Sequence, residues 1–257
     1  MPVTTILLFW LILTRITGMV MTFPILESRS IPGQVKIGFS IFLSLIVFPL
    51  VANTQIVSFP IEWMSYLLAI GGELILGITL GYSVKLLFIG IQLAGQIIGM
   101  QMGLSMARVI DPQSGVQVTL VSNFKNLLAI LIFLSLDAHY GFLKGLVDSF
   151  SLVPLTGFSL QPVTVQRVVG LVGDIFLISL KVGAPIIGTL LLTQITLGVL
   201  MRLVPQINIF MLAFPLKIGI GLIMLGLCLP YFLYFLRGLF FNIYQELIFT
   251  LQTMGAR

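Results

Sequence analysis

Apolar runs of membrane-spanning length follow one another along most of this chain. A bilayer core about 30 Å thick requires about 20 apolar residues of α-helix. Runs of roughly that length cover residues 4–26, 36–52, 63–84, 86–107, 126–152, 168–201 and 209–236, and an amphipathic stretch covers 238–254. The pattern predicts an all-α membrane protein with six or seven helices.

The composition agrees with this class. Hydrophobic residues make up 58% of the chain and charged residues only 8%, whereas soluble domains carry about 25% charged residues. The 257 residues leave no room for a separate soluble domain, so we expect one membrane domain over residues 1–257. The net charge is +5, but the basic residues are single and widely spaced, which favours anchoring at a lipid surface over binding to nucleic acid.

Several of the predicted helices are expected to be irregular. Pro185 lies in the middle of the run 168–201, and Pro230 lies near the end of the next one. Proline removes a backbone donor and tends to kink a helix. The run 126–152 is interrupted by polar residues, which are Asp137, His139 and Lys144.

Small residues recur at helical spacing in the charge-free run 86–107. The ladder consists of Gly95, Gly99 and Gly103, and Gly77 and Gly81 form a second pair with the same spacing. At about 100° per residue, such residues share one face of a helix. Small residues at this spacing let membrane helices approach closely, so close packing is favoured over pore lining.

A polar loop follows the ladder. Its notable residues are Arg108, Asp111, Pro112, Gln113, Gly115 and Gln117. Proline and glycine bend the chain, and non-helical backbone at membrane depth needs a place lined by water or protein. The loop is therefore either an ordinary solvated connector or part of a gate.

Five charged residues lie in or beside apolar segments. They are Arg15, Glu73, Lys85, Asp174 and Lys181. A charge at the centre of a membrane helix costs about 2.5–3.5 kcal/mol on insertion scales. These residues either form a polar pathway for an ion or substrate or, as we favour, neutralise partners in neighbouring subunits.

The residue types needed for catalysis or metal binding are scarce. The sequence contains no phosphate-binding loop, no HExxH and no GxSxG. It has one histidine, His139, and one cysteine, Cys228, which cannot supply a conventional zinc site. We therefore expect no catalytic residue, no metal site and no cofactor, and an enzyme is not the favoured class.

Four stretches carry a resemblance to a known family. They are Arg15 with Pro24 and the loop RSIPGQVKIGF; GELILGITLG leading into AGQIIGMQMGLSMARVIDPQSG; DAHYGFLKGLVDSFSLVPLTG; and LKVGAPIIGTLLLTQITLGVLMRLVPQINIFMLAFPLKIGIGL. Together, and in this order, they resemble the FliR/SctT family of export-gate proteins from bacterial flagella and type III secretion systems. The match spans nearly the whole chain.

The resemblance implies a specific function. Family members assemble with FliP and FliQ into a helically arranged export gate in the bacterial inner membrane, within the flagellar basal body, with FlhB and FlhA nearby. Their helices form bent hairpins, and the pore passes unfolded flagellar proteins outward. By this resemblance, the loop around residues 105–122 is the chain's contribution to the closed plug.

The last of the four stretches is the most specific, and we expect it to contact partner subunits. The residues in question are Arg202, Pro205, Gln206, Asn208, Phe210, Pro215 and Lys217. Without partners, the same stretch reads as a loop and a helix start, with Pro215 near the first turn. His139-Tyr140 stands where many relatives have two histidines, and Thr193-Gln194 where an acidic residue is common.

Other functions stay open at this point. The flagellar branch is favoured over the injectisome branch because the loops look flagellar. A secondary transporter of small solutes would use broken helices and membrane charges, but it predicts an inverted repeat that the sequence does not show. A purely structural scaffold without a pore contribution is the third possibility.

Overall fold

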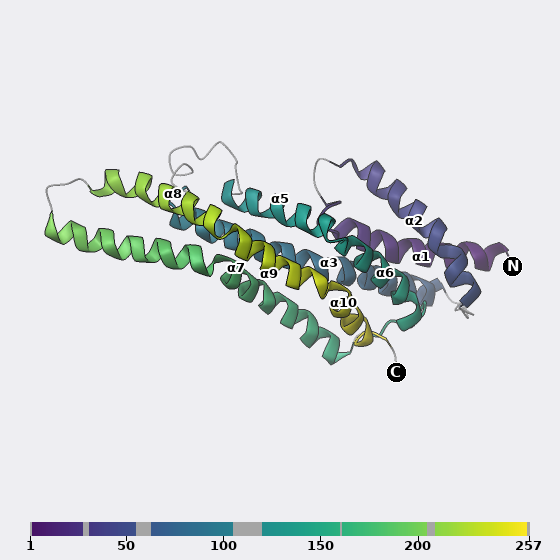
Figure 1. The fold of residues 1–257 in the computed structure, drawn as a ribbon. Helices are drawn as coiled ribbons and strands as arrows, with labels where there is room; N and C mark the ends of the chain where they lie inside the picture. The colour runs from purple at the N-terminus through teal and green to yellow at the C-terminus, as the bar shows by residue number, and fades with distance from the viewer. Residues whose placement is uncertain are drawn as a thin grey trace. The chain divides into compact units, whose positions relative to one another are not determined.

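The computed structural model describes residues 2–27, 31–54, 63–104, 120–159, 161–204 and 209–255. The helices follow one another as α1 (Pro2–Thr22), α2 (Gly33–Thr54), α3 (Trp63–Gln101), α5 (Leu120–Ser135), α6 (Ala138–Leu152), α7 (Pro162–Leu203), α8 (Ile209–Leu227), α9 (Leu229–Phe241) and α10 (Ile243–Gln252) (Figure 1). Within these ranges, the β-type backbone pairing is limited to one isolated antiparallel bridge between Phe158 and Gly255. The predicted all-α membrane class is confirmed.

Length and composition qualify four of the described helices as membrane spans, namely α1, α2, α3 and α7. The number rises to six if the interrupted pairs α5–α6 and α8–α10 each count as one span. The interruptions have local causes. Asp137 adopts a left-handed conformation (φ 54°) before α6, and α8 ends immediately before Cys228 and Pro230, as the proline predicts.

Three predicted boundaries were wrong. The runs 63–84 and 86–107 form one continuous helix, α3, that ends at Gln101. Lys85 does not break it, because its ammonium group reaches Glu27 from the side of the helix, at 2.6 Å. α5 begins at Leu120, not near residue 126, and α7 begins at Pro162, since proline is well suited to the first helical position.

The chain folds into two compact units. Unit 1 comprises Met1–Leu86, Asp137–Val172 and Phe241–Arg257, and unit 2 comprises Leu87–Leu136 and Gly173–Phe240. The long helices α3 and α7 therefore contribute residues to both. In unit 1, α1 packs on α2, and α6 packs on α10; Figure 1 shows the first pair side by side at the purple end.

The core of unit 2 is aliphatic at one place and aromatic at another. The aliphatic cluster is Ile98, Met102, Val121, Ile186 and Leu190, all buried. The aromatic cluster joins the rings of Phe88, Phe133 and Phe240, whose centroids lie 5.3–5.7 Å apart. Such edge and offset contacts stabilise a core beyond the area that they bury.

Candidate functional site

A fully buried ion pair lies in the middle of unit 1. Arg15 of α1 donates from Nε to Oε2 of Glu73 on α3 at 2.5 Å, and both side chains are 0% exposed. Charged hydrogen bonds of this kind are short and strong. The sequence predicted that these charges would be expensive in a membrane helix, and the structure pairs them with each other within one chain.

The remaining donors of Arg15 are satisfied by the end of α6. Nη1 donates to the carbonyl oxygen of Ser149 at 2.9 Å, and Nη2 donates to the carbonyl oxygen of Val153 at 3.0 Å. The guanidinium carbon lies 4.5 Å from the ring centroid of Phe150. Arg15 therefore adds a donor to the Ser149 carbonyl oxygen, which also accepts the N–H of Val153, and it satisfies the Val153 carbonyl oxygen just beyond the C-terminus of α6.

The second carboxylate oxygen of Glu73 holds the turn after α6. Oε1 accepts the backbone N–H of Thr156 at 3.1 Å, within a turn that Gly157 N–H closes on the Pro154 carbonyl oxygen. Thr156 has φ 67°, a left-handed conformation that is unusual for a β-branched residue. Strained backbone of this kind persists where surrounding contacts fix it.

Arg15 and Glu73 together hold α1, α3 and the end of α6 to one another, and we call this set of bonds the buried tie. The carboxylate and the guanidinium neutralise each other, and each also bonds to backbone from the segment 149–156. For Arg15 and Glu73 the expectation of partners in neighbouring subunits is therefore corrected, because their partners lie in the same chain. Burying the pair without its hydrogen bonds would be unfavourable, which explains why so many bonds converge on it.

The other three predicted charges are placed differently. Lys85 pairs with Glu27 of the same chain, so the expected partner in a neighbouring subunit is corrected for Lys85 as well; the two side chains are partly exposed, at 19% and 44%. The Lys85 Nζ also lies 4.8 Å from the ring centroid of Tyr82. Asp174 and Lys181 are exposed on α7. Their exposure on a membrane helix keeps a contact with another subunit as the preferred proposal.

The pair Gly77 and Gly81 packs directly against α1. A Cβ atom at Gly77 would overlap the carbonyl oxygen of Arg15, and one at Gly81 would overlap the Thr22 hydroxyl. In return, a Cβ atom at Gly18 would lie 2.9 Å from the carbonyl oxygen of Leu74. The two helices touch backbone to backbone, as small residues at this spacing allow.

The ladder Gly95, Gly99 and Gly103 is interrupted because α3 ends at Gln101, before Gly103. Gly95 faces α5, where a Cβ atom would collide with Cα of Ser122, and Ser122 Oγ donates to the Gln92 carbonyl oxygen at 2.9 Å. Gly99 is buried in the same helix. Gly103 lies beyond the helix, contrary to the predicted helical ladder: it has φ +84° and faces the ring of Phe214.

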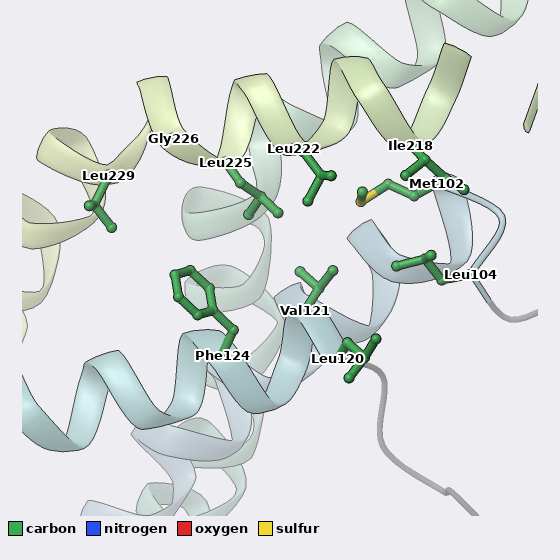
Figure 2. Close-up of a pocket in the computed structure, with 10 residues that line it drawn as sticks. All are labelled: Met102, Leu104, Leu120, Val121, Phe124, Ile218, Leu222, Leu225, Gly226 and Leu229. Carbon is green, nitrogen blue, oxygen red and sulfur yellow. The ribbon is translucent and has the colours of Figure 1, made fainter. Parts of the chain in front are cut away.

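An open apolar pocket of about 500 Å³ lies in unit 2. Figure 2 shows side chains from α5, α8 and α9 and from the end of α3 converging on it. The lining residues are Met102, Leu104, Leu120, Val121, Phe124, Ile218, Leu222, Leu225, Gly226 and Leu229. Leu104 and Leu120 flank residues 105–119, so both ends of that loop meet at one pocket.

The predicted plug residues lie outside the described part of the chain. They are Arg108, Asp111, Pro112, Gln113, Gly115 and Gln117. The same holds for Pro205, Gln206 and Asn208 and for the side chain of Phe210. Their roles remain predictions.

The described residues of the predicted partner-contact stretch lie on α7 and α8. Arg202 is exposed in the last turn of α7. Lys217 of α8 donates to Oε1 of Gln194 on α7 at 3.4 Å, consistent with the hairpin that α8 forms with the end of α7 in Figure 1. Pro215 lies in the second turn of α8, since that helix begins at Ile209, and thus follows directly on the first turn near which it was expected.

Sequence reasoning missed Lys125, which is buried in α5 with 4% of its surface exposed. Its Nζ lies 3.4 Å from the carbonyl oxygen of Val182 and 4.8 Å from the ring centroid of Phe232. The predicted apolar run began one residue later, at residue 126, so Lys125 was not counted among the membrane charges. A lysine one position before an apolar run was the available signal.

The chain is similar to known export proteins over nearly its whole length. The family model described as "Bacterial export proteins, family 1" matches residues 6–243. Three curated relatives carry the name "Flagellar biosynthetic protein FliR". The one from Pectobacterium carotovorum subsp. carotovorum is 36% identical, over 91% of this chain and 88% of the relative.

The other two relatives match to a similar extent. The protein from Escherichia coli (strain K12) is 33% identical, over 94% of this chain and 91% of its own length. The protein from Bacillus subtilis (strain 168) is 32% identical, over 90% of both chains. The similarity thus covers residues of both units.

Proposed function

The chain belongs to the bacterial export proteins of family 1 and is a subunit of the flagellar type III protein export gate, and from this premise we propose how it acts there. Together with FliP and FliQ it forms the pore through which unfolded flagellar proteins leave the cell. FlhB and FlhA lie nearby. The gate spans the bacterial inner membrane in the flagellar basal body, and residues 1–257 act in it as one membrane domain without enzymatic activity.

One observation carries this proposal: the similarity to flagellar relatives over about nine tenths of both chains. The described helices are long and apolar enough for four to six membrane spans, which supports a location of the chain in a membrane. The measurement that tests it is the native mass of the assembly purified through a tag on this chain. A ring with one copy of this chain and several copies of its partners supports the gate, whereas a lone chain that carries small solutes supports a transporter.

We also propose that the loop around residues 105–122 is part of the closed plug. Leu104 and Leu120 line one apolar pocket, which supports a loop tethered at both ends in one place. Deleting residues 110–118 is expected to leave assembly intact and to make the gate leaky to small ions, because the tethers remain while the plug is shortened. Ion flux into cells or vesicles measures the leak.

A second variant distinguishes the effect of shortening the loop from the effect of losing its side chains. Replacing residues 110–118 by a Gly-Ser segment of equal length should also leak, though less, because the polar side chains are lost while the span is kept. If both variants stay as ion-tight as the parent protein in a correctly assembled gate, the loop is not the plug.

The segment between α7 and α8 is proposed to contact partner subunits. A photo-crosslinker at position 206 is expected to capture FliP or FliQ, because Arg202, Asp174 and Lys181 are exposed on α7 and exposed charges on a membrane helix normally meet another helix or water. Mass spectrometry of the crosslinked bands identifies the partner. In cells that lack FliP and FliQ the bands must vanish; their absence from complete gates would exclude the contact.

A further inference from the structure

Pro185 leaves a gap in the hydrogen-bond ladder of α7. The helix runs from Pro162 to Leu203 with this proline inside it. Proline has no N–H, so the carbonyl oxygen of Lys181, four residues earlier, has no donor within the helix. The ring also pushes against that turn and loosens its geometry. At membrane depth such backbone groups need donors from elsewhere.

Two side chains from other helices of unit 2 donate to this turn. The hydroxyl group of Tyr231 on α9 donates to the carbonyl oxygen of Lys181 at 3.2 Å. The ammonium group of Lys125 on α5 lies 3.4 Å from the carbonyl oxygen of Val182, the next residue. The two adjacent carbonyl groups before Pro185 thus each face a donor, and the donors come from two different helices.

Among the described residues, Lys125 contacts a carbonyl oxygen and an aromatic ring and pairs with no carboxylate. It is 4% exposed and takes part in none of the ion pairs that the described residues form. Its Nζ lies 4.8 Å from the ring centroid of Phe232, the residue after Tyr231. An aromatic face and a carbonyl oxygen both attract a cation, so the charge is directed at the opened turn.

We propose that Lys125 and Tyr231 are positioning residues that clamp the proline-opened turn of α7. They fix the geometry of α7 at Pro185 and thereby set the direction of residues 186–203, on which α8 packs through the contact of Lys217 with Gln194. This role goes beyond the proposed gate function and does not depend on it. The clamp is needed because residue 185 is a proline.

The geometry of α7 at Pro185 can be measured by spin labels on either side of this residue. Leu177 and Val199 are both about half exposed on α7 and lie about 33 Å apart along a straight helix. Labels at these positions, in the assembled protein with Cys228→Ala, report the distribution of that distance. We expect Tyr231→Phe and Lys125→Met each to raise the population outside the parent distance about two- to tenfold, the factor that one lost hydrogen bond represents.

The decisive comparison uses Pro185→Ala. Alanine restores the N–H that bonds to the carbonyl oxygen of Lys181, so in this background Tyr231→Phe should change nothing. A dependence on Tyr231 that is equal in both backgrounds would overturn the clamp. Additivity of the substitutions in such a cycle is the sign that they do not interact.

If the Pro185→Ala protein does not assemble, Tyr234→Phe serves as a matched control for Tyr231→Phe. Tyr234 lies on the same helix and is 80% exposed, so Tyr234→Phe removes a hydroxyl group without touching α7. The clamp requires that Tyr231→Phe shift the distance distribution and Tyr234→Phe leave it unchanged. Equal behaviour of the two variants would refute it.

Discussion

Replacing Glu73 by glutamine is expected to lower the free energy of unfolding by about 3–5 kcal/mol, the usual cost of removing one partner of a buried ion pair. Arg15 would stay fully buried beside an uncharged group, since both side chains are 0% exposed. With a total stability of about 5–15 kcal/mol for a typical protein, a loss of this size should sharply reduce the amount of protein in the membrane. Unfolding of the purified assembly in detergent and immunoblotting of membranes measure the two effects.

The chain offers a matched control for this substitution. Glu27 forms an ion pair of similar length with Lys85, but its side chain is 44% exposed. Exposed pairs contribute about 0–1 kcal/mol, so Glu27→Gln should leave both stability and protein level nearly unchanged. Equal losses from Glu73→Gln and Glu27→Gln would show that burial of the first pair is not what makes it important.

Introducing a methyl group at Gly77 is the second substitution with a large expected effect. A Cβ atom there would overlap the carbonyl oxygen of Arg15 and lie 3.0 Å from the backbone nitrogen of Met19. Both are main-chain atoms, so no side-chain rotation relieves the clash, and α1 must move away from α3. Overpacking costs about 1–3 kcal/mol, and occasionally more, and displacing α1 also strains the bond from Arg15 to Glu73. Thermal unfolding of Gly77→Ala measures the loss.

Gly71 is the control on the same helix. A Cβ atom at Gly71 would meet nothing within 4 Å. Because alanine restricts the unfolded chain more than glycine does, Gly71→Ala should be neutral or stabilise by about 0.4–1 kcal/mol. If Gly77→Ala were as stable as Gly71→Ala, the close approach of α1 and α3 would be disproved.

Much of the fold could be predicted from the sequence because a bilayer imposes simple rules on it. Apolar length identified the membrane class, and prolines and polar residues identified the interruptions near Asp137 and Pro230. Two of the wrong boundaries lie at lysines, Lys85 and Lys125. Each charge is accommodated inside its helix by residues far away in sequence, such as Glu27 and Val182.

The candidate site was predictable only in part. Its expensive charges and its small residues stand out in a sequence, so Arg15, Glu73 and Gly77 could be named in advance. Their partners could not, because the ion pair joins residues 58 positions apart and its other bonds reach a further helix. The strained Thr156 has no sequence signal, since its conformation is held by a tertiary contact with Glu73.

The buried tie around Arg15 also bears on how the chain is made. Arg15 of α1 leaves the ribosome before its partners, because its counter-ion is residue 73 and its carbonyl partners are residues 149 and 153. Chains are synthesised at about 5–20 residues per second, so α1 waits for seconds with its cation unmatched. Unit 1 therefore completes its interior only after the turn at Thr156 has been made, and a nascent chain that stalls earlier leaves Arg15 of α1 incompletely paired.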